Sequence, residues 1–262
     1  KTLTAELQLD DFDLTFISTF PNMTIELYGA RLKGLNEFEG VTMADIKELR
    51  ANVGFWSVVG GDQIEIDEIH INEPSFDIRV LENGMANYDI VKPDSLKTEE
   101  EIQEPSSFKL SLKEYSITNA NIKYDDRASN MYAELDSMNH TGSGDLTADI
   151  IDFETTTTMN KLSYKMDGID YLTEVETDAQ VNILMEFTDK SSKFTLKENK
   201  LILNAITFAF DGYYEMLEDH DDMDIKLDYI QTIPVTYTSL LLFWIRKHVG
   251  FRRNVYPRIS KR

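Results

Sequence analysis

Cysteine is absent from this chain of 262 residues. A disulfide framework, a zinc site built on thiolates and a cysteine nucleophile are therefore excluded. Histidine is scarce, and none of the four (His70, His140, His220 and His248) stands at the i, i+4 spacing of a paired metal ligand. The sequence also lacks a phosphate-binding glycine loop, a dinucleotide fingerprint and a Gly-x-Ser-x-Gly elbow. These absences predict a protein that is not an enzyme and that has no cofactor and no metal site.

Basic charge and long apolar runs are also in short supply. Asp and Glu outnumber Lys and Arg by 47 to 26, which gives a net charge of −21. Such a field repels phosphate backbones, so nucleic acid is not expected as a partner, and it opposes flat binding to anionic lipid. The longest apolar run, at 239–245, is far shorter than the ~20 residues of a membrane-spanning helix. No signal peptide begins at Lys1, so we expect the chain to be a piece of a longer protein.

What the sequence does contain is a recurring apolar spacing. The pattern apolar-x-apolar-x-x-apolar-x-apolar runs through 7–16, 69–78 and 115–124, and more loosely through 201–210. Each copy joins two stretches of period-2 alternation through one extra residue, which keeps one strand face apolar on both sides of a bulge or bend. Such a repeat predicts an elongated sheet of stacked strand units. The alternative is that an ordinary antiparallel β protein produces the spacing by chance.

Strands dominate the rest of the chain, and helix is rare. Alternation predicts further strands at 23–27, 49–55, 108–112, 194–196 and 223–227. Turn signals separate the strands at 20–22, 60–62, 82–84, 142–145 and 211–212. We expect helix only as a turn or two within Thr42–Leu49 and Phe55–Val59. The predicted fold class is mainly β, an elongated, twisted antiparallel sheet that forms an open apolar groove.

Composition divides the chain into four segments. These are an N-terminal β unit (1–91), an acidic, proline-containing linker or loop (92–107), a second β unit (108–228) and a basic tail (229–262). We expect the two β units to form one continuous sheet, with separate domains as the alternative. The tail holds seven Lys or Arg and no Asp or Glu. We interpret it as an aberrant end of the reading frame rather than as a docking element for anionic lipid.

Two acidic motifs offer carboxylates at close spacing. The run 218–224 could attract a divalent cation, but it lacks the glycine and the ligand spacing of a calcium loop, so we interpret it as a solvated turn. In 124–127, Asp125 and Asp126 precede Arg127. A general acid–base site is one interpretation. The favoured one is a strand-end turn in which an aspartate accepts from a backbone N–H and pairs with Arg127.

The apolar strand face is the remaining candidate for function. A sheet that is polar on one side must cover the other side with a second sheet, a helix or a ligand. A sheet curled around this face would form a trough suited to acyl chains, whereas a closed sandwich would use the same side chains as its core. The residues expected to line the groove are Leu7, Leu9, Ile64, Ile66, Ile78, Leu110, Ile122, Leu203, Phe208 and Phe210.

Several stretches resemble AsmA-type proteins. Residues 19–27 (TFPNMTIEL) are similar to that family's fP-x-l-x-v-x-l segment, and 49–61 lead into the alternation of 64–78. Residues 83–90 (NGMANYDI) stand in the place of the family's dG-x-aN-w-d signature. Later stretches similar to Bacteroidetes-type members lie at 122–127, 144–146 and 203–212. The resemblance covers about 2–228.

The resemblance implies a bacterial envelope protein whose body lies in the periplasm and whose N-terminal helix anchors it in the inner membrane. The family is associated with outer-membrane assembly and with bridge-like lipid transfer through a β-groove, and the resemblance brings no catalytic residue. We therefore expect phospholipid acyl chains as the partner, with an outer-membrane protein partner left unidentified. The rival prediction is a secreted or surface β-sandwich, a binding or adhesion module with a closed core.

Overall fold

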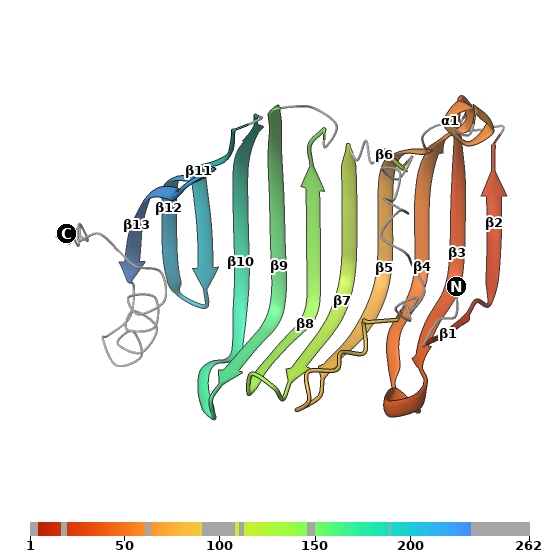
Figure 1. Ribbon diagram of the computed structural model, residues 1–262, viewed down its shortest axis with the longest axis horizontal. Coiled ribbons are helices and arrows are strands. Elements are labelled where there is room, and N and C mark those ends of the chain that lie inside the picture. The colour runs from red at the N-terminus through yellow and green to blue at the C-terminus, as the bar shows by residue number, and fades with distance from the viewer. Residues whose placement is uncertain are drawn as a thin grey trace.

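A computed structural model describes residues 5–16, 20–60, 64–90, 108–109, 113–145, 150–188 and 190–231. In this part of the chain the strands lie side by side in one sheet of thirteen strands (Figure 1). Contacts between elements join neighbours along the sheet, so no second sheet and no helix covers either face of the described strands. The predicted mainly β, open architecture is confirmed. A closed sandwich is not formed.

The chain contributes long strands and two short helices, in this order: β1 (Ala5–Gln8), β2 (Asp11–Thr15), β3 (Asn22–Gly34), η1 (Asn36–Phe38), β4 (Thr42–Gly54), α1 (Phe55–Gly60), β5 (Ile64–Val80), β6 (Phe108–Lys109), β7 (Glu114–Asp126), β8 (Met131–Ser143), β9 (Ile150–Met166), β10 (Ile169–Phe187), β11 (Ser191–Leu203), β12 (Ile206–Leu217) and β13 (Asp221–Gln231).

From β3 to β5 and from β7 to β13, sequential strands pair antiparallel, and the two parallel pairings of the sheet both involve β5, with β6 and with β7. The strand β7 runs parallel to β5, with Ile71 beside Ile117 and Phe76 beside Ile122. A parallel neighbour requires the chain to return to the starting end of β5 before β7 begins, and the connecting residues include the acidic segment 92–107. That segment lies outside the described residues. Strands from both predicted β units thus belong to one sheet.

The strands from β3 to β10 bend together at one level, which creases this part of the sheet (Figure 1). The extra residue of the second and third repeat copies adopts positive φ, at Glu73 of β5 and Asn119 of β7. Their counterparts on β3, β8 and β10 are Gly29, Ser137 and Glu174. A left-handed residue within a strand shifts the alternation by one position, so the same face stays apolar on both sides of the crease.

At the sheet edge the same crease breaks the strand in two. The first repeat copy forms β1 and β2, which pair with the two halves of β3. Between them the Asp10 carboxylate hydrogen-bonds Arg31 and fills the space that a side chain at Gly29 would occupy. Position 29 therefore requires glycine for two reasons: the backbone has positive φ there, and the Asp10 carboxylate leaves no room for a side chain.

Polar side chains of the neighbouring strand satisfy the backbone N–H groups that the crease removes from the ladder. Across β7 and β8 the arrangement is reciprocal, because the N–H of Asn119 donates to Asn139 Oδ1 at 3.0 Å and the N–H of Ser137 donates to Asn121 Oδ1 at 3.2 Å. The N–H of Glu174 donates to Ser163 Oγ in the same way. The crease is thus built into the sequence rather than imposed by packing.

Three local expectations were wrong. Residues Thr42–Leu49 belong to β4 and not to a helix, because their apolar positions pair across β3 and β5. The loose fourth repeat copy is a hairpin, in which Asn204 with φ of 52° turns the chain between β11 and β12. Gly212 lies inside β12, where the backbone of Asp224 comes too close to allow a side chain. The helical turn expected at Phe55–Val59 is confirmed as α1.

The segment after β5 closes a short turn against its own strand. Asn87 is only 4% exposed, and its amide joins the edge of β5: Oδ1 accepts from the N–H of Arg79 at 3.0 Å and Nδ2 donates to the carbonyl of Asp77 at 2.7 Å. The N–H of Asn87 also donates to the carbonyl of Arg79. One side chain therefore replaces a strand partner at this position.

We expect Asn87→Ala to lower the free energy of unfolding by about 2 to 4 kcal/mol, because it orphans one buried donor and one buried acceptor on β5. Asn83→Ala is the matched control, since Asn83 accepts only one local, exposed bond from Met85. Urea unfolding of both variants measures the difference. Equal midpoints for the two variants would contradict the role assigned to Asn87.

Candidate functional site

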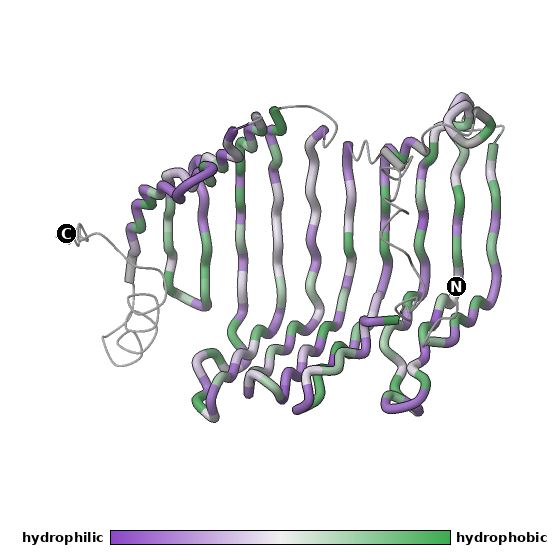
Figure 2. The backbone as a smooth tube through the Cα atoms, viewed as in Figure 1, coloured by the Kyte–Doolittle hydropathy of each residue, from purple (hydrophilic) through white to green (hydrophobic). Residues whose placement is uncertain are grey.

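The apolar face extends across the sheet, because residues opposite one another on adjacent strands share a face. Green and purple segments alternate along the strands in Figure 2, as this arrangement requires. On one side of the crease the row reads Leu7, Leu32, Ala44, Phe76, Ile122, Leu135, Leu162 and Val175. On the other side it reads Phe12, Leu27, Leu49, Ile71, Ile117, His140, Thr157, Ala179, Leu201, Phe208 and Tyr229.

Two clusters of buried side chains lie on this face. Ala120 has no exposed surface and packs with Met138 and Met159. A second cluster holds Val175 and Phe208. Around both clusters the larger side chains of the face, among them Ile117, Ile122, Leu135, Leu162, Leu201 and Leu227, are only half-buried. A single sheet therefore presents a broad apolar surface that no described segment covers.

Most of the predicted groove residues share this face. Leu7, Ile66, Ile78, Ile122, Leu203, Phe208 and Phe210 lie on it, as their cross-strand partners show. Leu9 lies at the break between β1 and β2 and is exposed. Ile64 is the first residue of β5, but its side chain lies outside the described part, as does Leu110.

A polar island interrupts the face at its centre, and sequence reasoning missed it. The hydroxyl of Tyr115 lies 2.6 Å from His140 Nε2, and His140 Nδ1 lies 2.8 Å from Thr157 Oγ1. The ring of Tyr115 lies over Gly142, where any side chain would collide with it. The sequence signal that could have revealed it is the presence of His140 and Thr157 at positions of β8 and β9 where the alternation calls for apolar residues.

Burial governs the titration of this island. Desolvation lowers the pKa of His140 below its ordinary 6.5 and raises the pKa of the Tyr115 phenol, so both groups are held neutral. A neutral island can sit in an apolar surface without the cost of burying a charge.

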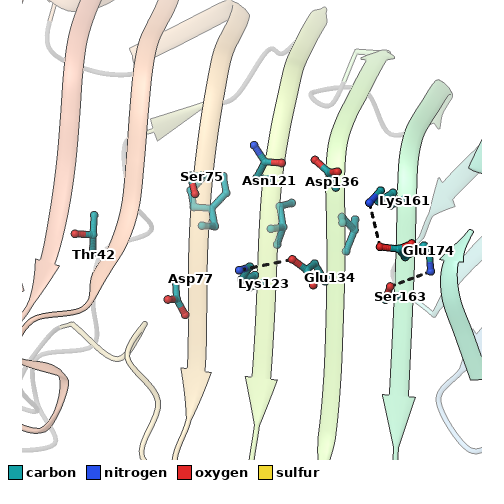
Figure 3. A pocket seen from close by; sticks show the side chains of 13 residues that line it. Thr42, Ser75, Asp77, Asn121, Lys123, Glu134, Asp136, Lys161, Ser163 and Glu174 are labelled. Carbon is teal, nitrogen blue, oxygen red and sulfur yellow. Dashed lines mark hydrogen bonds and ion pairs between the residues drawn. The ribbon is translucent and has the colours of Figure 1, made fainter. Parts of the chain in front are cut away.

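The opposite face of the sheet is polar and holds a hollow of about 510 Å³ at the crease (Figure 3). Its charged side chains are largely paired: Lys123 lies 3.6 Å from Glu134, and Lys161 lies 3.0 Å from Glu174. Beside it, hydrogen bonds from Arg79 hold the pKa of Asp77 below its usual range. Compensated charges of this kind are typical of a solvated surface.

The motif 124–127 ends β7 in a turn, whereas the acidic run forms a turn only at 218–220 and continues as the first residues of β13. The N–H of Ser129 donates to Asp126 Oδ1 at 2.9 Å, which lowers the pKa of Asp126, and Arg127 pairs with Asp125. This confirms the favoured interpretation of 124–127. In the acidic run, Asp221 and Asp222 accept from tyrosine hydroxyls of β12. Among the described residues, no group of three or more His, Asp or Glu is arranged to hold a metal ion.

Comparison with known proteins identifies the family. The sequence model of the AsmA family matches residues 3–195, so the chain belongs to the AsmA family. Membership supports an envelope-associated, lipid-related role. No curated protein and no solved structure matches the chain. Within the part of the chain that the structure describes, no helix has the length and apolar character needed to cross a bilayer. Strand β13 includes Tyr229 and ends at Gln231; the remainder of the predicted basic tail lies outside the described residues.

The lowered pKa of His140 makes stability depend on pH. In the unfolded chain His140 binds a proton near pH 6.5, and in the folded chain it does so only at lower pH. The stabilisation that comes from neutral His140 is therefore complete above about pH 6.5 and is lost as the pH falls below that value. We expect His140→Gln to reduce the drop in melting temperature between pH 7.5 and pH 5. His220→Gln, at an exposed turn, is the control. An unchanged drop in His140→Gln would show that His140 titrates normally.

Proposed function

We propose that this protein carries phospholipid on the apolar face of its sheet and has no catalytic activity. The observation that carries the proposal is the uncovered face itself. Large aliphatic and aromatic side chains stay half-buried across the strands β3 to β13, with no described element packed on them. Leaving such a surface in water is unfavourable by roughly 25 cal/mol for each Å² of apolar area, and an acyl chain can cover it without supplying hydrogen bonds.

The geometry favours acyl chains over a protein core. The apolar row from Leu7 to Val175 crosses the sheet at right angles to its strands, so its length grows with each strand added. A chain of methylene groups matches a long, narrow apolar surface of this kind. No ionisable side chain stands in this row, and a charged headgroup would therefore remain in the solvent.

Cellular setting and partners follow from the family and are part of the same proposal. We infer a periplasmic body anchored in the inner membrane, with a role in outer-membrane biogenesis in which phospholipid is carried or bridged across the periplasm. The proposal includes an outer-membrane protein partner, whose identity is open.

The test is lipid binding by the purified chain, measured by mass spectrometry of extracted lipid and by displacement of a fluorescent fatty acid. We expect phospholipid to co-purify and Ile122→Glu to reduce probe affinity about tenfold or more, because the new carboxylate must be desolvated beneath the acyl chain. Thr118→Glu is the matched control, since Thr118 is exposed on the polar face of the same strand β7.

Unfolding must be followed in parallel, because a charge in a closed core destabilises the whole fold. Lost binding with a retained melting transition supports the proposal. Absence of lipid from the unmutated chain, together with global unfolding of Ile122→Glu, would refute it and would mean that the face is a core.

A further inference from the structure

One corner of the sheet is built on uncharged segments of the chain, with Glu65 and Asp67 of β5 at their border, although 28% of the residues of the chain are charged. Two uncharged stretches meet there: 14–25, which includes the connection from β2 to β3, and 51–61, which includes α1. Figure 1 shows α1 beside the end of β2. Among the other described connections between strands, only the two-residue turn Asn204–Ala205 is also free of charge.

Aromatic contacts hold this corner together. The ring of Phe16 lies 4.4 Å from that of Phe55 and 5.7 Å from that of Phe20, and Phe55 contacts Trp56 at 5.1 Å. The N–H of Phe55 donates to the carbonyl of Pro21 at 3.2 Å. The four rings therefore form one packed unit in the described part of the two connections, and together with Val59 of α1 we call it the aromatic tip (Phe16, Phe20, Phe55, Trp56 and Val59).

A polar bond ties α1 to the sheet below. Ser57 Oγ donates to the carbonyl of Gly54 at 2.6 Å and accepts from the N–H of Glu65 at 3.0 Å. This fixes the short helix at the ends of β4 and β5, so the tip is presented by rigid strands.

The outer side chains of the tip are among the most exposed large apolar groups of the protein. Phe20 is 63% exposed, Trp56 65% and Val59 62%, whereas Met23 and Val53 beneath them are buried. The row Met23, Val53 and Ile66 belongs to the apolar face, so that face continues to the tip without a polar break.

We propose that the aromatic tip inserts into the interfacial region of an electrically neutral lipid bilayer. Tryptophan and phenylalanine favour the boundary between headgroups and acyl chains, and the absence of charge lets the whole tip enter it. The net charge of −21 directs the choice of surface, because an anionic bilayer repels the body that follows the tip. The inference rests on the proposed function, since lipid passing between a bilayer and the apolar face would enter at this corner.

The fluorescence of Trp56 can report whether the tip enters a bilayer. The chain has two tryptophans, and Trp244→Phe leaves Trp56 as the single fluorophore. With phosphatidylcholine vesicles we expect a blue shift of Trp56 emission and quenching by lipids brominated near the top of the acyl chain. Vesicles containing phosphatidylserine at low salt should bind more weakly.

Variants separate the tip from the rest of the face. Phe20→Ser together with Val59→Ser should weaken vesicle binding at least tenfold while Trp56 still reports, and co-purified lipid should remain. Ile169→Ser is the control, because Ile169 is also exposed but is the first residue of β10, next to the turn from β9. The melting temperature of each variant verifies folding.

Two results would overturn the inference: an unquenched Trp56 at saturating lipid, or a tip variant that loses self-association instead of vesicle binding. Failure of the lipid-carrying role would appear differently, as no co-purified lipid in a chain whose Trp56 is still quenched by vesicles.

Discussion

The crease is the constraint on which the rest of the structure depends. Side chains alternate along a strand with a period of two. A bend that uses one extra residue would therefore place the apolar side chains of that strand out of line with those of its neighbours, unless the neighbouring strands insert an extra residue at the same level. Between β3 and β7 they do so without any shift of register at this level, since Gly29, Glu73 and Asn119 stand in one line. The apolar surface survives because the bends coincide.

The polar groups released by the crease explain why it needs particular residues. An orphaned N–H within a strand costs as much as a lost hydrogen bond, and a side-chain oxygen on the adjacent strand recovers it. Asn121 and Asn139 do this reciprocally for β7 and β8. A separate bulge in β11, at a different level of the sheet, follows the same rule, because the N–H of Glu198 donates to Asp211 Oδ1 at 2.5 Å. Asparagine and aspartate on the polar side of a strand are thus part of the bend and not incidental surface.

The sequence was sufficient to predict that the chain is mainly β, that one strand face is apolar and that an extra residue preserves that face across a bend, because each of these depends on local spacing. It was insufficient where strand pairing determines the structure. Thr42–Leu49 alternates imperfectly, and only its pairing with β3 and β5 makes it a strand. The spacing of 201–210 is the same for a bend and for a two-residue hairpin, and Asn204 selects the hairpin by adopting positive φ.

Long-range placement was the other limit. Parallel pairing of β5 with β7 joins residues 46 positions apart, such as His70 and Ser116, whose side chains lie 2.8 Å apart. The role of Asn87 was hidden for the same reason, since its partners are backbone groups of β5. The polar island likewise requires three strands in register before Tyr115, His140 and Thr157 become neighbours.

The crease divides the apolar face into two parts, and the polar island lies in only one of them. On one side of the crease the row from Leu7 to Val175 contains only apolar side chains. On the other side the row through Ile117 meets His140 and Thr157 before it becomes apolar again at Ala179. An acyl chain that lies across the strands therefore meets no hydrogen-bonding group along the first row, whereas along the second it must pass over one. The proposed carrier accordingly has one uninterrupted apolar track, whereas the polar island crosses the other.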